Sequence, residues 1–107
     1  MTDDAATALL QAIGASFAGI DAVFRVQELS SRSWASVTFS GARHRVTFCL
    51  EGAVAGSAAD AFVTQMSEAE FDLDGHILAD IALLGADRSP SGDRVQLRLE
   101  ALTVEDR

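Results

Sequence analysis

Apolar residues near the start of the chain recur three or four positions apart, as one buried face of a helix requires. They are Ala6, Leu9, Leu10, Ile13 and Phe17. Asp3 and Asp4 precede them and offer side-chain oxygens that cap a helix N-terminus, and Gly19 is a suitable stop. The pattern predicts a helix over about residues 4–18.

From Asp21 onward the apolar period shortens to two, which is typical of strands with one buried face. Gly41 and Ala42 interrupt the alternation, and a glycine in the first central position suits the type II′ turn of a two-residue hairpin. That turn places Val37 opposite Val46. His44 then lies on the same apolar face and is expected at a strand end. The predicted strands of this half cover residues 22–29, 34–40 and 43–51.

The second half of the chain predicts a short helix and a second hairpin. Ser57 followed by Asp60 resembles a capping box and is expected to open the helix. The alternation then returns, and it predicts a strand over 69–84 that bends at Gly75, a loop over 87–92 and a last strand over 94–104. In the favoured register, Leu83 faces Val95 and Asp80 faces Arg98 on the outer side.

This order of elements, α-β-β-β-α-β-β, predicts an α+β fold with a mainly antiparallel sheet and helices on one face. A chain of 107 residues fits a single domain over 1–107. The element order, small size and acidic charge are similar to those of type III secretion chaperones, although their final helix is lacking here and no motif matches.

Composition excludes several classes of partner and compartment. Eight basic residues against 16 acidic ones give a net charge of −8, so we expect no binding to nucleic acid or anionic membranes. With no long apolar run and no charged-then-apolar leader, we expect neither a membrane span nor a secretory signal, and hence a cytoplasmic protein. Cys49 is the only cysteine, which excludes an intramolecular disulfide. The absence of Lys, Asn and Tyr indicates a GC-rich bacterial genome.

One cluster of side chains has the spacing of metal ligands. Glu70, Asp72, Asp74 and His76 alternate along a predicted strand, so they share a face on which oxygen and imidazole ligands could meet a divalent cation. The other interpretation is that these charges discourage pairing between sheet edges. Since neither a nucleophile elbow nor a phosphate-binding loop is present, no catalytic residue and no cofactor are assigned.

A second set of residues shares the outer face of the predicted sheet, away from the helices. It consists of Trp34, Arg43, Arg45, Arg94 and Arg98. Trp and Arg are enriched at the centres of protein interfaces. The alternatives are cross-strand ion pairs with Glu51, Asp80 and Glu100, or binding of a small anion.

The sequence therefore favours a small non-catalytic protein-interaction module, adaptor- or chaperone-like. It is expected to form a homodimer through the outer sheet face, with another protein as the alternative partner. The competing hypothesis is a small-ligand or metal-dependent enzyme that uses Asp72, Asp74 and His76.

Overall fold

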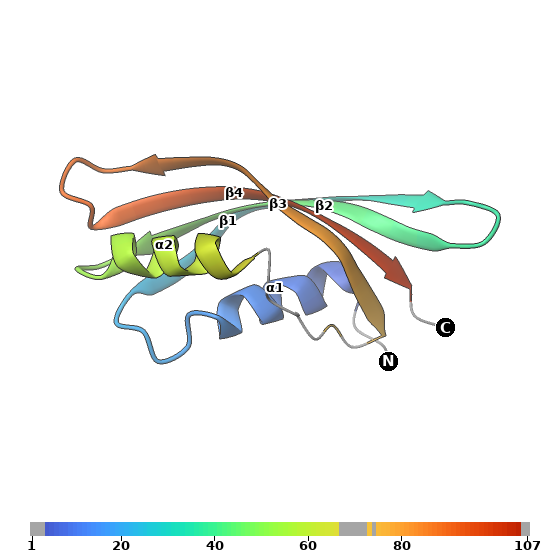
Figure 1. The fold of residues 1–107 in the computed structure, drawn as a ribbon, viewed down its shortest axis with the longest axis horizontal. Coiled ribbons are helices and arrows are strands. Elements are labelled where there is room, and N and C mark those ends of the chain that lie inside the picture. The colour runs from blue at the N-terminus through green and yellow to red at the C-terminus, as the bar shows by residue number, and fades with distance from the viewer. Residues whose placement is uncertain (1–3, 67–72, 74, 106–107) are drawn as a thin grey trace.

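The computed structural model describes residues 4–66, 73 and 75–105. Its elements follow the order α-β-β-α-β-β, which confirms the predicted α+β class with one strand fewer than expected (Figure 1). They are α1 (Ala5–Ala15), β1 (Val23–Ala35), β2 (Ser40–Glu51), α2 (Ala55–Met66), β3 (His76–Arg88) and β4 (Arg94–Glu105).

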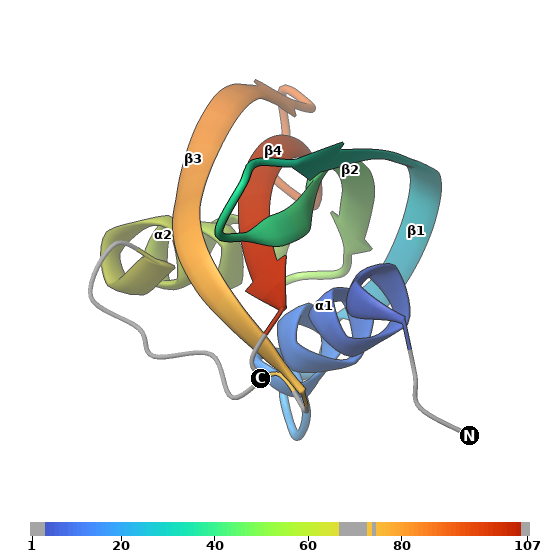
Figure 2. The ribbon, with the colours of Figure 1, turned by 90° about the vertical axis from the view of Figure 1, so that its right-hand side faces the viewer.

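The four strands form one antiparallel sheet in the order β1-β2-β4-β3. Each half of the chain thus contributes one helix and one hairpin, and the second strands of the two hairpins pair at the centre. Both helices cover the same face of the twisted sheet, as predicted (Figures 1 and 2). The opposite face, called the outer face below, is covered by no described element.

Both helices begin close to their predicted starts, but only α1 has the N-terminal cap that the sequence predicts. Asp4 caps α1, because its Oδ1 accepts a hydrogen bond from the Thr7 N–H at 2.8 Å. The helix ends at Ala15, three residues before the predicted end. In α2 the expected capping box is absent, since the Ser57 hydroxyl donates to the carbonyl oxygen of Val54 and Asp60 pairs with Arg88.

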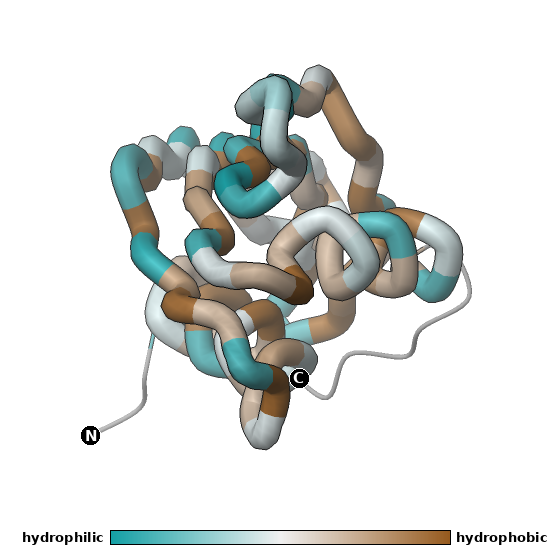
Figure 3. The backbone as a smooth tube through the Cα atoms, turned by 90° about the vertical axis from the view of Figure 1, so that its left-hand side faces the viewer, coloured by the Kyte–Doolittle hydropathy of each residue, from teal (hydrophilic) through white to brown (hydrophobic). Residues whose placement is uncertain are grey.

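The core lies between the helices and the central strands. Figure 3 colours the backbone by hydropathy, and hydrophobic and hydrophilic residues alternate along parts of it. Four phenylalanines meet in the core, and Phe48 of β2 contacts the other three with ring centroids 5.1–5.8 Å apart. The remaining three rings are Phe17, Phe24 and Phe62. No helix among the described residues is long and apolar enough to cross a membrane.

The predicted first hairpin is wrong in its turn and its register. The strand expected at 22–29 continues through a bulge between Val26 and Glu28 as far as Ala35, and so includes the first residues of the strand expected at 34–40. The rest of that expected strand forms the turn and the start of β2. The turn lies at residues 36–39, where the Ser36 N–H donates to the Phe39 carbonyl oxygen at 2.7 Å. This register pairs Phe24, Val26 and Leu29 with the apolar residues of β2, whereas the predicted one would have left them outside the hairpin.

The second hairpin is also shifted from its predicted register. Leu83 pairs with Leu99 rather than Val95, and Asp80 pairs with Leu102 rather than Arg98. Two irregularities in β3 change the register along the strand, and the strand continues to Arg88 before the turn begins. The part of the predicted strand over 69–72 and 74 lies outside the described residues.

Candidate functional site

Cross-strand pairing arranges the outer face in transverse rows that run across the sheet. From the turn of the first hairpin inward, three rows follow in the order β1, β2, β4, β3. They are Trp34–Gly41–Val104–Ile77, Arg32–Arg43–Leu102–Asp80 and Ser30–Arg45–Glu100–Ala82. The first row is apolar, and the next two hold five charged side chains: Arg32, Arg43, Arg45, Asp80 and Glu100.

All five residues predicted to share the outer face lie on it. Most arginines of this face form ion pairs within the chain, so their presence alone does not indicate a partner. Whether the face binds a partner stays a prediction. Arg43 and Arg45 both bind Glu100, at 2.7 and 3.1 Å. The hydrogen bond from Arg43, followed by that from Arg45, lowers the pKa of Glu100. Arg98 pairs with Asp87 at 3.0 Å instead of the expected Asp80.

Arg32 is a further charged residue of this face that the sequence did not single out, because a turn at Gly41 and Ala42 would have paired it with Glu51. In the structure Arg32 lies directly opposite Arg43, an arrangement of like charges that destabilises a strand pair. No ion pair of Arg32 is found within the described part of the chain. A groove of about 410 Å³ at this place is lined by Ser30, Ser31, Arg32, Arg43 and Arg45.

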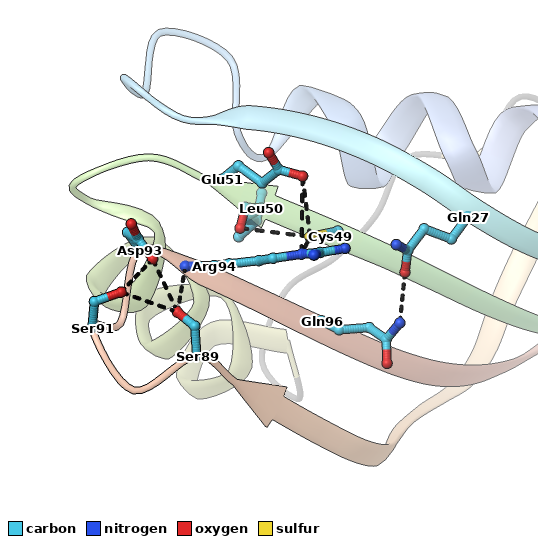
Figure 4. Close-up of polar contacts among 9 residues, drawn as sticks. All are labelled: Gln27, Cys49, Leu50, Glu51, Ser89, Ser91, Asp93, Arg94 and Gln96. Atoms are coloured by element: carbon cyan, nitrogen blue, oxygen red, sulfur yellow. Dashed lines mark hydrogen bonds and ion pairs between the residues drawn. The ribbon is translucent and has the colours of Figure 1, made fainter.

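At the opposite end of the outer face the polar groups satisfy one another (Figure 4). Cys49 is fully buried, and its sulfur accepts a hydrogen bond from Arg94 Nε at 3.3 Å. In the neighbouring turn, the hydroxyls of Ser91 and Ser89 donate to Asp93 and lower the pKa of its carboxyl. These contacts explain the local structure without a ligand.

A buried histidine lies on the helix side of the sheet, in the middle of β2 rather than at a strand end. His44 is 1% exposed. Its Nδ1 is 2.7 Å from Ser31 Oγ, and its Nε2 is 2.9 Å from Thr103 Oγ1. Thr103 donates its own proton to the Ala42 carbonyl oxygen at 3.3 Å. Its oxygen therefore accepts from the Nε2–H of the imidazole, which leaves Nδ1 to accept the proton of Ser31.

Burial keeps this imidazole neutral. Desolvation lowers the pKa of His44, while the charge of Asp4 acts weakly in the opposite direction and that of His76 in the same one. The result is a neutral base that is fixed by Thr103 and hydrogen-bonded to the hydroxyl of an exposed serine.

We expect His44 to make the stability of the protein depend on pH. Because its pKa is lower in the folded state than the unfolded value of about 6.5, the unfolded chain binds more protons below that pH. The free energy of unfolding should therefore fall as the pH drops below about 6.5, and should not depend on His44 above it. Urea unfolding of wild type and His44→Gln at a series of pH values measures this. An equal pH dependence in the two proteins would contradict it.

The predicted metal cluster is largely beyond what the structure describes. Glu70, Asp72 and Asp74 lie outside the described residues, and His76 is half-buried at the start of β3. Among the side chains that the structure does describe, no group of three His, Cys, Asp or Glu residues could hold a metal ion. The metal hypothesis thus stays a prediction.

We compared the chain with known families, curated proteins and solved structures. No family model, no curated protein and no solved structure matches this chain.

Proposed function

We propose that this protein is a cytoplasmic protein-interaction module, adaptor- or chaperone-like, that forms a homodimer through the outer face of its sheet. The charge distribution on that face carries the proposal. The chain has a net charge of −8, yet the described strands present six arginines and five acids on the outer face. These are Arg25, Arg32, Arg43, Arg45, Arg94 and Arg98, with Glu28, Glu51, Asp80, Asp87 and Glu100. Two copies can therefore approach here with less repulsion than elsewhere.

The two edges of the outer face differ in sign, which favours a second copy as the partner. The outer side of β1 presents Arg25 and Arg32 with one acid, whereas that of β3 presents Asp80 and Asp87 with no base. Two aligned sheets related by a two-fold axis along the strands would place β1 of one copy over β3 of the other. Arg32 would then face the partner's Asp80.

The apolar row at the end of the face fits the same arrangement. Trp34 is half-buried on β1 and Ile77 is 51% exposed on β3. The same two-fold axis would bring Trp34 of one copy to the partner's Ile77, and the reverse contact would form as well. An aromatic anchor beside charged pairs is a common composition of interface centres.

The proposal predicts that charge reversal on the outer face separates the dimer. We expect dimer mass for the wild type in light scattering, and monomer mass for the double variant Arg45→Glu/Arg98→Glu, since like charges would then oppose one another. Arg88→Glu is the matched control, because Arg88 pairs with Asp60 of α2 away from the outer face. It should leave the mass unchanged.

A charge-swap experiment tests the orientation. Arg32→Glu and Asp80→Arg should each weaken the homodimer, whereas an equimolar mixture should form a heterodimer in which both contacts again join opposite charges. A monomeric wild type would overturn the proposal. A dimer whose mass is unchanged by every one of these outer-face variants would do the same.

A further inference from the structure

The groove beside Arg32 is lined only by arginines and serines. Its volume is about 410 Å³, and three of its five lining residues are Arg32, Arg43 and Arg45. These side chains lie on the outer face, the first on β1 and the other two on β2. Ser30 places its hydroxyl on the same face, whereas the hydroxyl of Ser31 points to the helix side. The groove is therefore a positively charged feature of the outer face.

The charge of this groove is only partly neutralised within the chain. Glu100 binds Arg43 and Arg45, while Arg32 has no ion pair in the described part of the chain. Three guanidinium groups and one carboxylate leave two positive charges uncompensated. Glu28, the single acid of β1, lies in the next row of the face and does not line the groove. The local charge is thus opposite in sign to that of the whole chain.

The guanidinium groups retain hydrogen-bond donors for a ligand. Arg43 reaches Glu100 through Nη1, and Arg45 reaches it through Nε. Each guanidinium carries several N–H donors in a fixed fork, so both can keep Glu100 and bind a further anion. Arg32 lies directly opposite Arg43, and an anion between them would replace repulsion by attraction.

The charge and the size of the groove indicate the class of ligand. Two uncompensated positive charges match a dianion, and a phosphate monoester carries a charge of about −1.5 to −2 at pH 7. Its three terminal oxygens accept hydrogen bonds from several directions, which suits guanidinium groups on two strands better than the two coplanar oxygens of a carboxylate. The groove is larger than a phosphate group alone and leaves room for an organic substituent.

We propose that this groove binds the phosphate group of a small phosphate monoester, and that this binding competes with the homodimer. The competition rests on the proposed function, in which Arg32 faces the partner's Asp80. The ligand and the second copy then use the same guanidinium group, so each excludes the other. A ligand that binds only the monomer shifts the equilibrium toward the monomer, and dimer formation weakens the apparent affinity for the ligand by the same linkage.

An NMR titration of Asp80→Arg tests the site separately from the dimer. This variant weakens the proposed dimer, and Asp80 lies on β3, beyond β4 from the groove. Phenyl phosphate should shift the Nε–H signals of the groove arginines. Methyl phenyl phosphate, with a single negative charge, should bind about 10-fold more weakly.

A second substitution in the same background tests the role of Arg32. Asp80→Arg/Arg32→Gln should bind phenyl phosphate about 10-fold more weakly or worse, because it loses charge-assisted hydrogen bonds. Arg25→Gln is the matched control, since Arg25 lies on the outer face of β1 opposite Cys49 and outside the groove. It should leave the affinity unchanged. Equal binding with and without Arg32, or no shift of the groove signals at millimolar ligand, would overturn the site.

Light scattering of the wild type tests the competition. Phenyl phosphate should shift the mass from dimer toward monomer, and the apparent affinity should fall as the protein concentration rises. A dimer that binds phenyl phosphate without a change in mass would overturn the competition. A monomeric wild type would overturn both the dimer of the proposed function and the competition, while the titration of Asp80→Arg would still decide the site.

Discussion

Replacing Phe48 with alanine is expected to lower the free energy of unfolding by about 3–5 kcal/mol. Phe48 is 0% exposed and lies on β2, where its ring contacts three other phenylalanines from α1, α2 and β1 or their flanking segments. Its removal leaves a cavity at the point where both helices meet the sheet. A domain of this size has a total stability of about 5–15 kcal/mol, so the variant should retain only part of its folded population at elevated temperature.

Urea unfolding followed by circular dichroism measures this loss, and Phe39→Ala is its control. Phe39 is 57% exposed in the turn between β1 and β2, so the same substitution there removes little buried area. We expect a change within about 1 kcal/mol at this position. Equal losses for the two variants would contradict the placement of Phe48 in the core.

Gly41→Ala is expected to lower the free energy of unfolding by about 1–3 kcal/mol or more, through overpacking. Gly41 lies inside β2, and a Cβ atom built on it would lie 1.9 Å from the carbonyl oxygen of Thr103 and 2.9 Å from the Trp34 ring. Neither the β4 backbone nor the ring can be displaced without disturbing the apolar row. This glycine is therefore required for close approach of the strands.

Gly14→Ala is the matched control for this substitution, with the opposite expected sign. A Cβ atom at Gly14 would make an ordinary 3.5 Å contact with the Phe24 ring, and alanine stabilises a helix interior by about 0.5–1 kcal/mol relative to glycine. Thermal unfolding of both variants should show shifts in opposite directions. A neutral effect of Gly41→Ala would contradict the close approach of the strands at this position.

The face on which a residue lies could be predicted from the sequence even where its partner could not. Side chains alternate along each strand regardless of which strand is adjacent, so the outer position of Trp34, Arg43 and Arg45 followed from the period alone. The helix over about 4–18 was predicted nearly correctly because its apolar face and the Asp4 cap are local features. These are the parts of the fold that a short stretch of sequence determines.

Register and the histidine network depend on contacts between distant residues. The actual turn, residues 36–39, contains no Gly, Pro or Asn, so no local signal marks it. Gly41 resembles a turn glycine, but it is required for the close approach of β2 to Thr103 and Trp34. The bulge beside Val26 concealed the continuity of β1. The contact between His44 and Thr103 forms only because β2 pairs with β4, an arrangement that no local pattern in either strand indicates.

The duplicated order of elements has a consequence for how the chain folds. Each hairpin closes over a short turn, and such hairpins form within about 1–10 μs. The pairing of β2 with β4 must instead close a longer loop that contains α2 and β3. Closing it costs more conformational entropy than closing either hairpin. Phe48 and Leu97 face each other across this central pair. We therefore expect the pairing of β2 with β4 to be the slow step that joins the two halves of the fold. Substitutions along this pair should slow folding more than they speed unfolding.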